Sequence, residues 1–247
     1  MQRFHFFSVF KKTTFMKRNL LTLIIPVLLF ACVQTAPGQM QKEERNVATF
    51  TSVDLAISAN VYLTQGSAQK VVVEASNEDL KKVVTEVSNG HLKIKTDGWR
   101  VNIKTVNVYI TLSDLEGIGL SGSGNITADG AFKCGSLDLA ISGSGNIKMA
   151  NLTATKVETA ISGSGNISLA GSSKAESLEI AISGSGDVNA ENFECGKVAA
   201  HISGSGNCRV NASDTLEGHV SGSGDIYYKG KARLDIRISG SGKARSI

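Results

Sequence analysis

The chain has 247 residues, of which 41% are hydrophobic and 19% are charged, a composition that suits a folded core and argues against intrinsic disorder. Its formal net charge of +4 depends on five basic residues within the first 32 positions, which contain no acidic residue. Without that segment, 21 lysines and arginines face 22 acidic residues, so we expect no electrostatic surface for nucleic acid.

The first predicted element is an export signal that ends at Cys32. From Met16, an alternative start, two basic residues precede an apolar run over residues 20–30, which is short for a membrane-spanning helix. The run ends in Leu-Phe-Ala-Cys, which resembles a bacterial lipobox whose cysteine becomes the acylated first residue of the mature protein. We therefore interpret residues 1–32 as a signal peptide and predict lipidation at Cys32. Ordinary signal-peptidase cleavage after Gly38 is the alternative.

Polar residues 33–46 show no apolar periodicity, so we predict a tether there. Residues 47–247 then form one predicted domain. No proline occurs from residue 38 onward, which suits an uninterrupted ladder of backbone hydrogen bonds.

Residues 47–115 are rich in β-branched residues and predict several irregular strands or coils. Between these runs, residues 77–87 (NEDLKKVVTEV) begin with a capping residue and two early acids, followed by apolar residues at helical spacing. This pattern predicts one short helix or helical turn.

The tetrapeptide Ser-Gly-Ser-Gly dominates residues 116–247. Its seven copies begin at Ser121 and recur every 18 to 21 residues, and six of them are followed by Asn or Asp. Apolar and polar residues alternate before each copy, which predicts a strand with one inward and one outward face. Because a unit of about 20 residues cannot bury its apolar face alone, we predict that the units stack as coils of an all-β solenoid. Residues 58–61 (Ser-Ala-Asn-Val) resemble a degenerate corner that starts the stack.

We interpret the Gly-rich corners as structural, because glycine adopts backbone conformations closed to other residues and stacked Asn side chains can hydrogen-bond from coil to coil. The alternative, a phosphate-binding loop, needs a helix N-terminus behind it and usually a lysine. The predicted corner residues are Gly122, Gly124, Asn125, Gly143, Gly145, Asn146, Gly163, Gly165, Asn166, Gly184, Gly186, Asp187, Gly204, Gly206, Asn207, Gly222, Gly224 and Asp225.

An outward column two residues before the motif changes from alanine to His201, His219 and Arg237. Successive coils would stack these three side chains on one face, where they form a candidate surface site that binds an anionic glycan or takes part in acid–base chemistry. A plain solvated surface is the alternative. The other residues best suited to stack on a sugar are Trp99, Tyr227 and Tyr228. We expect these aromatic residues to pack or to cap the stack instead.

A neighbouring outward column is acidic and consists of Asp138, Glu158, Glu179, Glu217 and Asp235. Stacking would place these like charges about 4.8 Å apart. We expect salt and the nearby Lys148 and Arg209 to relieve the repulsion, with bound Ca²⁺ as the alternative. We predict no metal site, no cofactor and no catalytic residue.

Three further cysteines show no metal-binding or redox spacing. Cys134 and Cys195 stand in one column three coils apart, roughly 14 Å, which is too far for a disulfide. With Cys208, which stands in an inward isoleucine column, they are interpreted as small buried thiols.

Over roughly residues 50–243 the chain resembles the auto-transporter adhesin head GIN domain family, which is common in exported proteins of Bacteroidetes. The resemblance rests on residues 61–66, residues 77–94, residues 106–115 and the Ser-Gly-Ser-Gly-Asn corners. It implies a single-stranded right-handed β-helix, and the family name suggests adhesion.

We therefore predict an exported, lipid-anchored, non-catalytic β-solenoid that serves as an adhesion or binding module in the outer membrane, at the cell surface or on the periplasmic face. The expected partner is a glycan or a surface protein, and the membrane is contacted only through the lipid anchor. A periplasmic structural scaffold is the first alternative. A polysaccharide lyase or hydrolase is the second, because right-handed β-helices often carry those activities. End-to-end association of coils is a further expectation.

Overall fold

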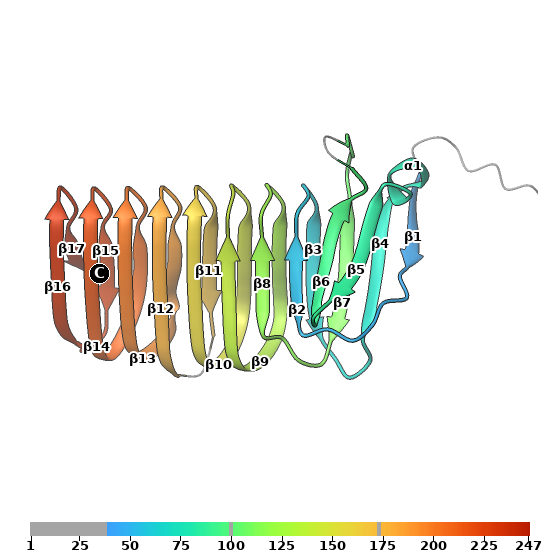
Figure 1. Cartoon of the computed structure of the whole chain (residues 1–247). Helices are drawn as coiled ribbons and strands as arrows, with labels where there is room; N and C mark the ends of the chain where they lie inside the picture. The colour runs from blue at the N-terminus through green and yellow to red at the C-terminus, as the bar shows by residue number, and fades with distance from the viewer. Residues whose placement is uncertain (1–38, 99–100, 172–173) are drawn as a thin grey trace, which may run out of the picture. The chain divides into compact units, whose positions relative to one another are not determined.

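The computed structural model describes residues 39–98, 101–171 and 174–247, which form a β-solenoid (Figure 1). The predicted signal peptide, Cys32, Gly38 and Trp99 lie outside the described residues. Within the described part, no helix is long and apolar enough to cross a membrane. The prediction of an all-β solenoid with coils of about 20 residues and one short helix is confirmed.

The helix and the strands have the following bounds in chain order: β1 (Met40–Glu44), β2 (Ser52–Leu55), β3 (Asn60–Gln65), β4 (Lys70–Ser76), α1 (Asn77–Leu80), β5 (Val83–Ser88), β6 (His91–Thr96), β7 (Asn107–Leu112), β8 (Gly117–Leu120), β9 (Asn125–Ile141), β10 (Asn146–Gly163), β11 (Asn166–Ala170), β12 (Ala175–Gly184), β13 (Val188–Gly204), β14 (Cys208–Gly222), β15 (Ile226–Lys229), β16 (Arg233–Gly240) and β17 (Ala244–Ser246).

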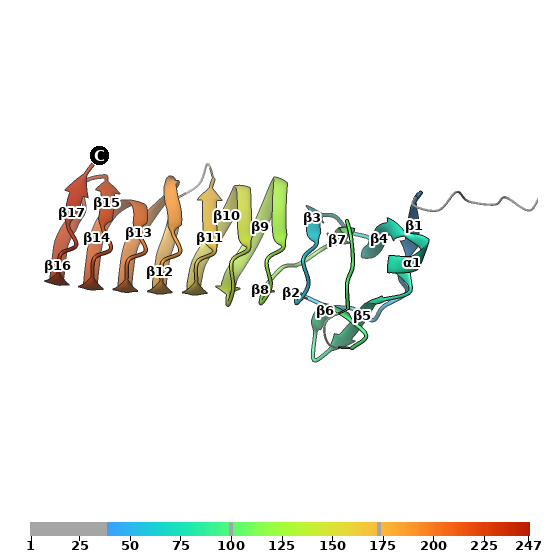
Figure 2. The ribbon, with the colours of Figure 1, turned by 90° about the horizontal axis from the view of Figure 1, so that it is seen from above.

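From β9 onward, the coils follow one another in chain order, and each pairs in parallel with the coil before it (Figures 1 and 2). Equivalent residues of successive repeats are direct partners, so that Ile161 pairs with both Ile141 and Ile182. This register stacks identical residues along the axis of the solenoid, and each position of the repeat becomes a column.

The inward columns form the hydrophobic core. One column contains Leu137, Val157, Leu178, Val198 and Leu216, all at most 2% exposed. A coil of this size could not bury these side chains alone, because their partners come from the coils on either side. The core is therefore continuous along the stack.

The corners bring backbones into close contact and link the coils by a polar ladder. The first glycine of the motif has a positive φ in five copies, between 136° and 148°, a region that residues with a Cβ rarely occupy. Asn146 Nδ2 donates to Asn125 Oδ1 at 2.9 Å, and Asn166 Nδ2 donates to Asn146 Oδ1 at 2.9 Å. Further along, the backbone N–H of Asn207 donates to Asp187 Oδ1 at 2.7 Å. These bonds are the coil-to-coil contacts expected of structural corners.

The coil β2–β3 does not begin the stack. β2 pairs in parallel with both β6 and β8, and β3 pairs in parallel with both β7 and β9, so this coil lies between two later ones. Asn60 accordingly donates to Asn107 Oδ1 at 3.3 Å and accepts from Asn125 Nδ2 at 3.1 Å. The degenerate corner at residues 58–61 exists, but the prediction that it starts the stack is wrong.

The helix predicted over residues 77–87 is shorter than expected. It ends at Leu80, and Val83–Ser88 forms β5, which pairs antiparallel with β6. Asn89 and Gly90 join the two strands with φ of 52° and 77°. An Asn-Gly turn between two segments that contain β-branched residues favours a hairpin over a longer helix.

The tether prediction is wrong for residues 40–44, which form β1 at the end of the stack. β1 pairs antiparallel with β4, and oppositely charged side chains meet across the two strands: Lys70 Nζ lies 2.7 Å from Glu44 Oε2. A polar strand at a sheet edge needs no buried face, so hydropathy alone does not reveal it. β1 belongs to the same compact unit as the coils.

Candidate functional site

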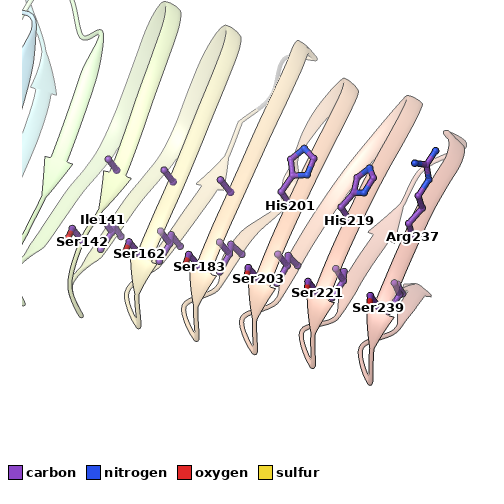
Figure 3. Close-up of a pocket in the computed structure, with 18 residues that line it drawn as sticks. Ile141, Ser142, Ser162, Ser183, His201, Ser203, His219, Ser221, Arg237 and Ser239 are labelled. Atoms are coloured by element: carbon purple, nitrogen blue, oxygen red, sulfur yellow. The ribbon is translucent and has the colours of Figure 1, made fainter.

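The predicted outward column forms as expected in register. Ala140, Ala160 and Ala181 pair in successive coils, and the column continues through His201 and His219 to Arg237 (Figure 3). The three alanines are exposed, so the column presents methyl groups in three coils and the longer histidine and arginine side chains in the next three.

An open groove of about 770 Å³ follows this column along the axis of the stack. One side is the column itself, and the other is the first serine of each motif. These serines are Ser142, Ser162, Ser183, Ser203, Ser221 and Ser239. Between the two rows lies the backbone of the inward column that contains Ile161.

The imidazole rings of His201 and His219 stack with centroids 5.2 Å apart and planes 19° apart. His219 Nε2 lies 3.2 Å from Glu217 Oε1, and Arg237 Nε lies 3.6 Å from Asp235 Oδ1. The equivalent position beside His201 is Ala199. Two of the three basic side chains therefore have a carboxylate neighbour on their own strand, which weakens the attraction of this column for an anion.

The acidic column also forms in register: Glu158 pairs with Asp138 and Glu179. The adjacent Lys156 forms an ion pair with Glu158. Its hydrogen bond to Glu158, and the negative charges of Glu158, Glu179 and Asp138, raise the pKa of Lys156. Lys156 is thus the cation that relieves the repulsion between these carboxylates.

The residues predicted to relieve that repulsion lie elsewhere. Lys148 Nζ binds Asp129 Oδ1 at 3.0 Å, and the Arg209 guanidinium lies over the Tyr227 ring at 4.4 Å. Both belong to the strand segment that follows the Asn corner, so the prediction that they neutralise the acidic column is wrong. Among the residues that the structure describes, no three His, Cys, Asp or Glu side chains are arranged to hold a metal ion.

With the fold and the groove described, comparison with known proteins gives the family. The family model "Putative auto-transporter adhesin, head GIN domain" matches residues 49–232. The chain belongs to this family. No curated protein matches it.

Solved structures share the head GIN domain fold. A structure titled putative adhesin from Bacteroides fragilis is 24% identical, with a TM-score of 0.78, covering 85% of this chain and 97% of that one. A structure titled putative adhesin from Parabacteroides distasonis is 26% identical, with a TM-score of 0.63, and the match covers 85% of this chain and 98% of that one. A third structure, titled putative lipid binding protein from the same species, is 22% identical, with a TM-score of 0.70, and the match covers 84% of this chain and 96% of that one.

The three cysteines of the head GIN domain are free thiols. Cys195 and Cys208 are buried and Cys134 is half-buried, and Ala154 and Ala175 separate Cys134 from Cys195 along their column. Burial raises the pKa of Cys134 to about 11 and those of Cys195 and Cys208 to about 12. At neutral pH these thiols are protonated and therefore poor nucleophiles.

From the sequence we did not predict an aromatic pair on β3 and β7, two paired strands that each begin with Asn. The rings of Tyr62 and Tyr109 stack with centroids 5.3 Å apart, and Tyr62 is 40% exposed. Tyr109 is fixed by a hydrogen bond from its hydroxyl to Glu74 Oε2 at 2.8 Å, and Lys42 Nζ lies 4.9 Å from its ring centre. The signal was the sequence Asn-Val-Tyr, which occurs at residue 60 and again at residue 107.

Proposed function

We propose that this head GIN domain protein is exported, anchored by a lipid at Cys32, and serves as a non-catalytic binding module for adhesion at the cell surface. Membership of an adhesin family supports a cell-surface binding role. The basic and apolar leader that ends in Leu-Phe-Ala-Cys supports export and anchoring.

The observation that carries the proposal is the groove. It extends over six coils, from Ala140 to Arg237, and presents a serine hydroxyl at each step, beside an alanine methyl group in three coils and a basic side chain in the other three. A repeating surface of this kind makes many weak contacts with an extended ligand, and affinity then arises from their number.

The exposure of the carboxylates supports binding rather than hydrolysis. A glycosidase needs one carboxyl group held protonated in an apolar setting. Asp138 and Glu179 are exposed, and Glu158 is only half-buried and is paired with Lys156.

The test is protease accessibility on intact cells, with a Cys32→Ala variant that cannot be acylated. We expect digestion of the wild-type protein on intact cells, incorporation of labelled fatty acid into the wild type alone, and release of the variant from the membrane. Protection until the outer membrane is opened would contradict the surface role and favour a periplasmic scaffold. Retention of the unlabelled variant would contradict the anchor.

A further inference from the structure

We infer that the alanine section of the groove binds a linear glycan that carries amino groups, with one sugar ring against the imidazole of His201. The inference rests on the proposed binding function and adds the chemical class of the ligand. We define the trough as the section over Ala140, Ala160 and Ala181.

The trough has an end wall on each side. Beyond Ala140 the column continues to Gly119 and then Asp54, whose carboxylate lies where a Cβ of Gly119 would be. Beyond Ala181 it continues to His201. The methyl floor is therefore bounded by a carboxylate, which lies over Gly119, and an imidazole, about 19 Å apart for four steps of about 4.8 Å per coil.

His201 offers one open ring face to this trough. Its other face is stacked on His219, and its partner in the preceding coil is Ala181, which is too short to cover the ring (Figure 3). A ring lying over Ala181 could pack its apolar C–H face on the imidazole and its edges against the serine hydroxyls. Flat apolar floors with polar edges suit sugars, which are apolar on their faces and polar at their rims.

The charge beside the trough selects the kind of glycan. A second hollow of about 220 Å³ lies between the alanines and the acidic column, so Asp138, Glu158 and Glu179 border the trough directly. Lys156 pairs with one of these three carboxylates, which leaves an excess of negative charge. This side attracts ammonium groups and repels carboxylates, so an amino sugar fits it and a uronic acid does not.

A peptide fits less well. Added peptide strands need a free sheet edge, and the backbone of β12 is already paired with β10 on one side and β13 on the other. A peptide lying across the coils would find only side-chain hydroxyls for its amide groups. A glycan has no such backbone requirement.

The test measures binding of the full chain, purified in detergent, to immobilised oligosaccharides by surface plasmon resonance. The probes are protonated chitosan oligomers, their neutral N-acetylated forms and polygalacturonate oligomers. We expect the tightest binding to chitosan, falling as salt is raised, weaker binding to the neutral form and none to polygalacturonate. Equal or tighter binding of polygalacturonate, or binding of none of the three, would overturn the inference.

Matched variants locate the site. Ala160→Arg fills the trough and should weaken binding about tenfold or more, whereas Ser168→Arg, on the exposed side of β11, should not change it. Glu179→Gln should weaken chitosan binding about threefold and leave the neutral oligomer unchanged, whereas Glu176→Gln, exposed on the same strand outside the trough, should have no effect. Equal effects within either pair would place the site elsewhere.

The role of the imidazole is tested by two variants. His201→Ala should weaken binding of chitosan and of its N-acetylated form about threefold, whereas His201→Phe keeps an aromatic ring and should bind both as the wild type does. Equal binding by both variants would remove the ring from the site. If the protein binds none of the glycans but is still digested by protease on intact cells, this inference alone is overturned. If the protein binds chitosan in vitro but is protected from protease on intact cells, only the proposed surface role is overturned.

Discussion

At the residue scale, Cys208 illustrates how a column determines the chemistry of its members. It stands where neighbouring coils have Val188 and Ile226, and like them it is fully buried. Burial raises the pKa of its thiol from 9.0 to about 12, because a thiolate would have to lose its hydration. The cysteine is a small apolar residue in this setting.

This burial makes stability depend on pH under alkaline conditions. The unfolded thiol ionises above about pH 9 while the folded one keeps its proton, so its stabilising contribution is complete below pH 9 and is lost progressively toward pH 12. We expect Cys208→Val to make the loss of unfolding free energy over that range shallower, as measured by urea denaturation at a series of pH values. A parallel decline in wild type and variant would contradict the expectation.

The side chains of the candidate site were predictable where the repeat fixes the register. The column of His201, His219 and Arg237 follows from their shared position, two residues before each motif. The neutralising role of Lys156 is not evident from the repeat, because its column, two positions earlier in the strand than the acidic one, has Ser136 and Ser177 in the adjacent coils. The Tyr62–Tyr109 stack was missed because these residues are 47 positions apart in the chain but neighbours in space.

At the scale of elements, the corner sets how closely two coils approach. A Cβ on Gly186 would overlap the carbonyl oxygen of Gly165 in the preceding coil, and the same relation recurs at the last glycine of the other motifs. Glycine is required here for space and not for its backbone conformation, because φ is not positive at this position.

We expect Gly186→Ala to lower the free energy of unfolding by about 3 kcal/mol, because backbone atoms in a paired sheet cannot move away from the added methyl group. Gly135→Ala is the matched change in the same fold, with no atom within 4 Å of its added Cβ. Urea denaturation should show the first variant clearly destabilised and the second within about 1 kcal/mol of wild type. Similar values for both would mean that the coils can separate at little cost.

The repeat predicts the strands of residues 116–247, and its absence from residues 40–88 explains the errors in predicting α1 and β1. Period-two alternation located the strands of residues 116–247, whereas α1 and β1 fall in segments without a repeat. The extent of α1 is decided by the Asn89-Gly90 hairpin turn that follows it. The strand conformation of β1 is stabilised by backbone pairing and ion pairs with β4, a long-range interaction that local polarity does not reveal.

At the scale of the whole stack, the two ends of the described solenoid differ. One end is covered by the antiparallel strands β1, β4 and β5. At the other, Leu234 is 43% exposed and Ile238 is 37% exposed on β16, although the equivalent residues of inner coils are buried. Exposed apolar edge strands are sites of association.

We expect the 247-residue chain to dimerise through β16 as its concentration rises, because this edge strand exposes apolar side chains, whereas the edge strand β1 at the other end is mostly polar and charged. Leu234→Lys should reduce this association, as measured by light scattering, while Leu115→Ile, a buried change elsewhere, should not. A monomer at high concentration, or equal dimerisation of both variants, would contradict the expectation.

The position of β2–β3 within the stack determines the order in which the chain can fold. Ladder contacts between regular coils join residues 18 to 21 positions apart, as between Asn146 and Asn125, whereas Asn60 must wait for Asn125, 65 positions later. Loops of that length close more slowly and bring a larger entropy loss. In a chain synthesised from its N-terminus, one side of the first coil therefore stays unpaired until about half of the sequence has been made, although β6 and β7 can pair with the other side earlier. Once that coil is enclosed, it provides a finished template on which each later repeat can add in turn.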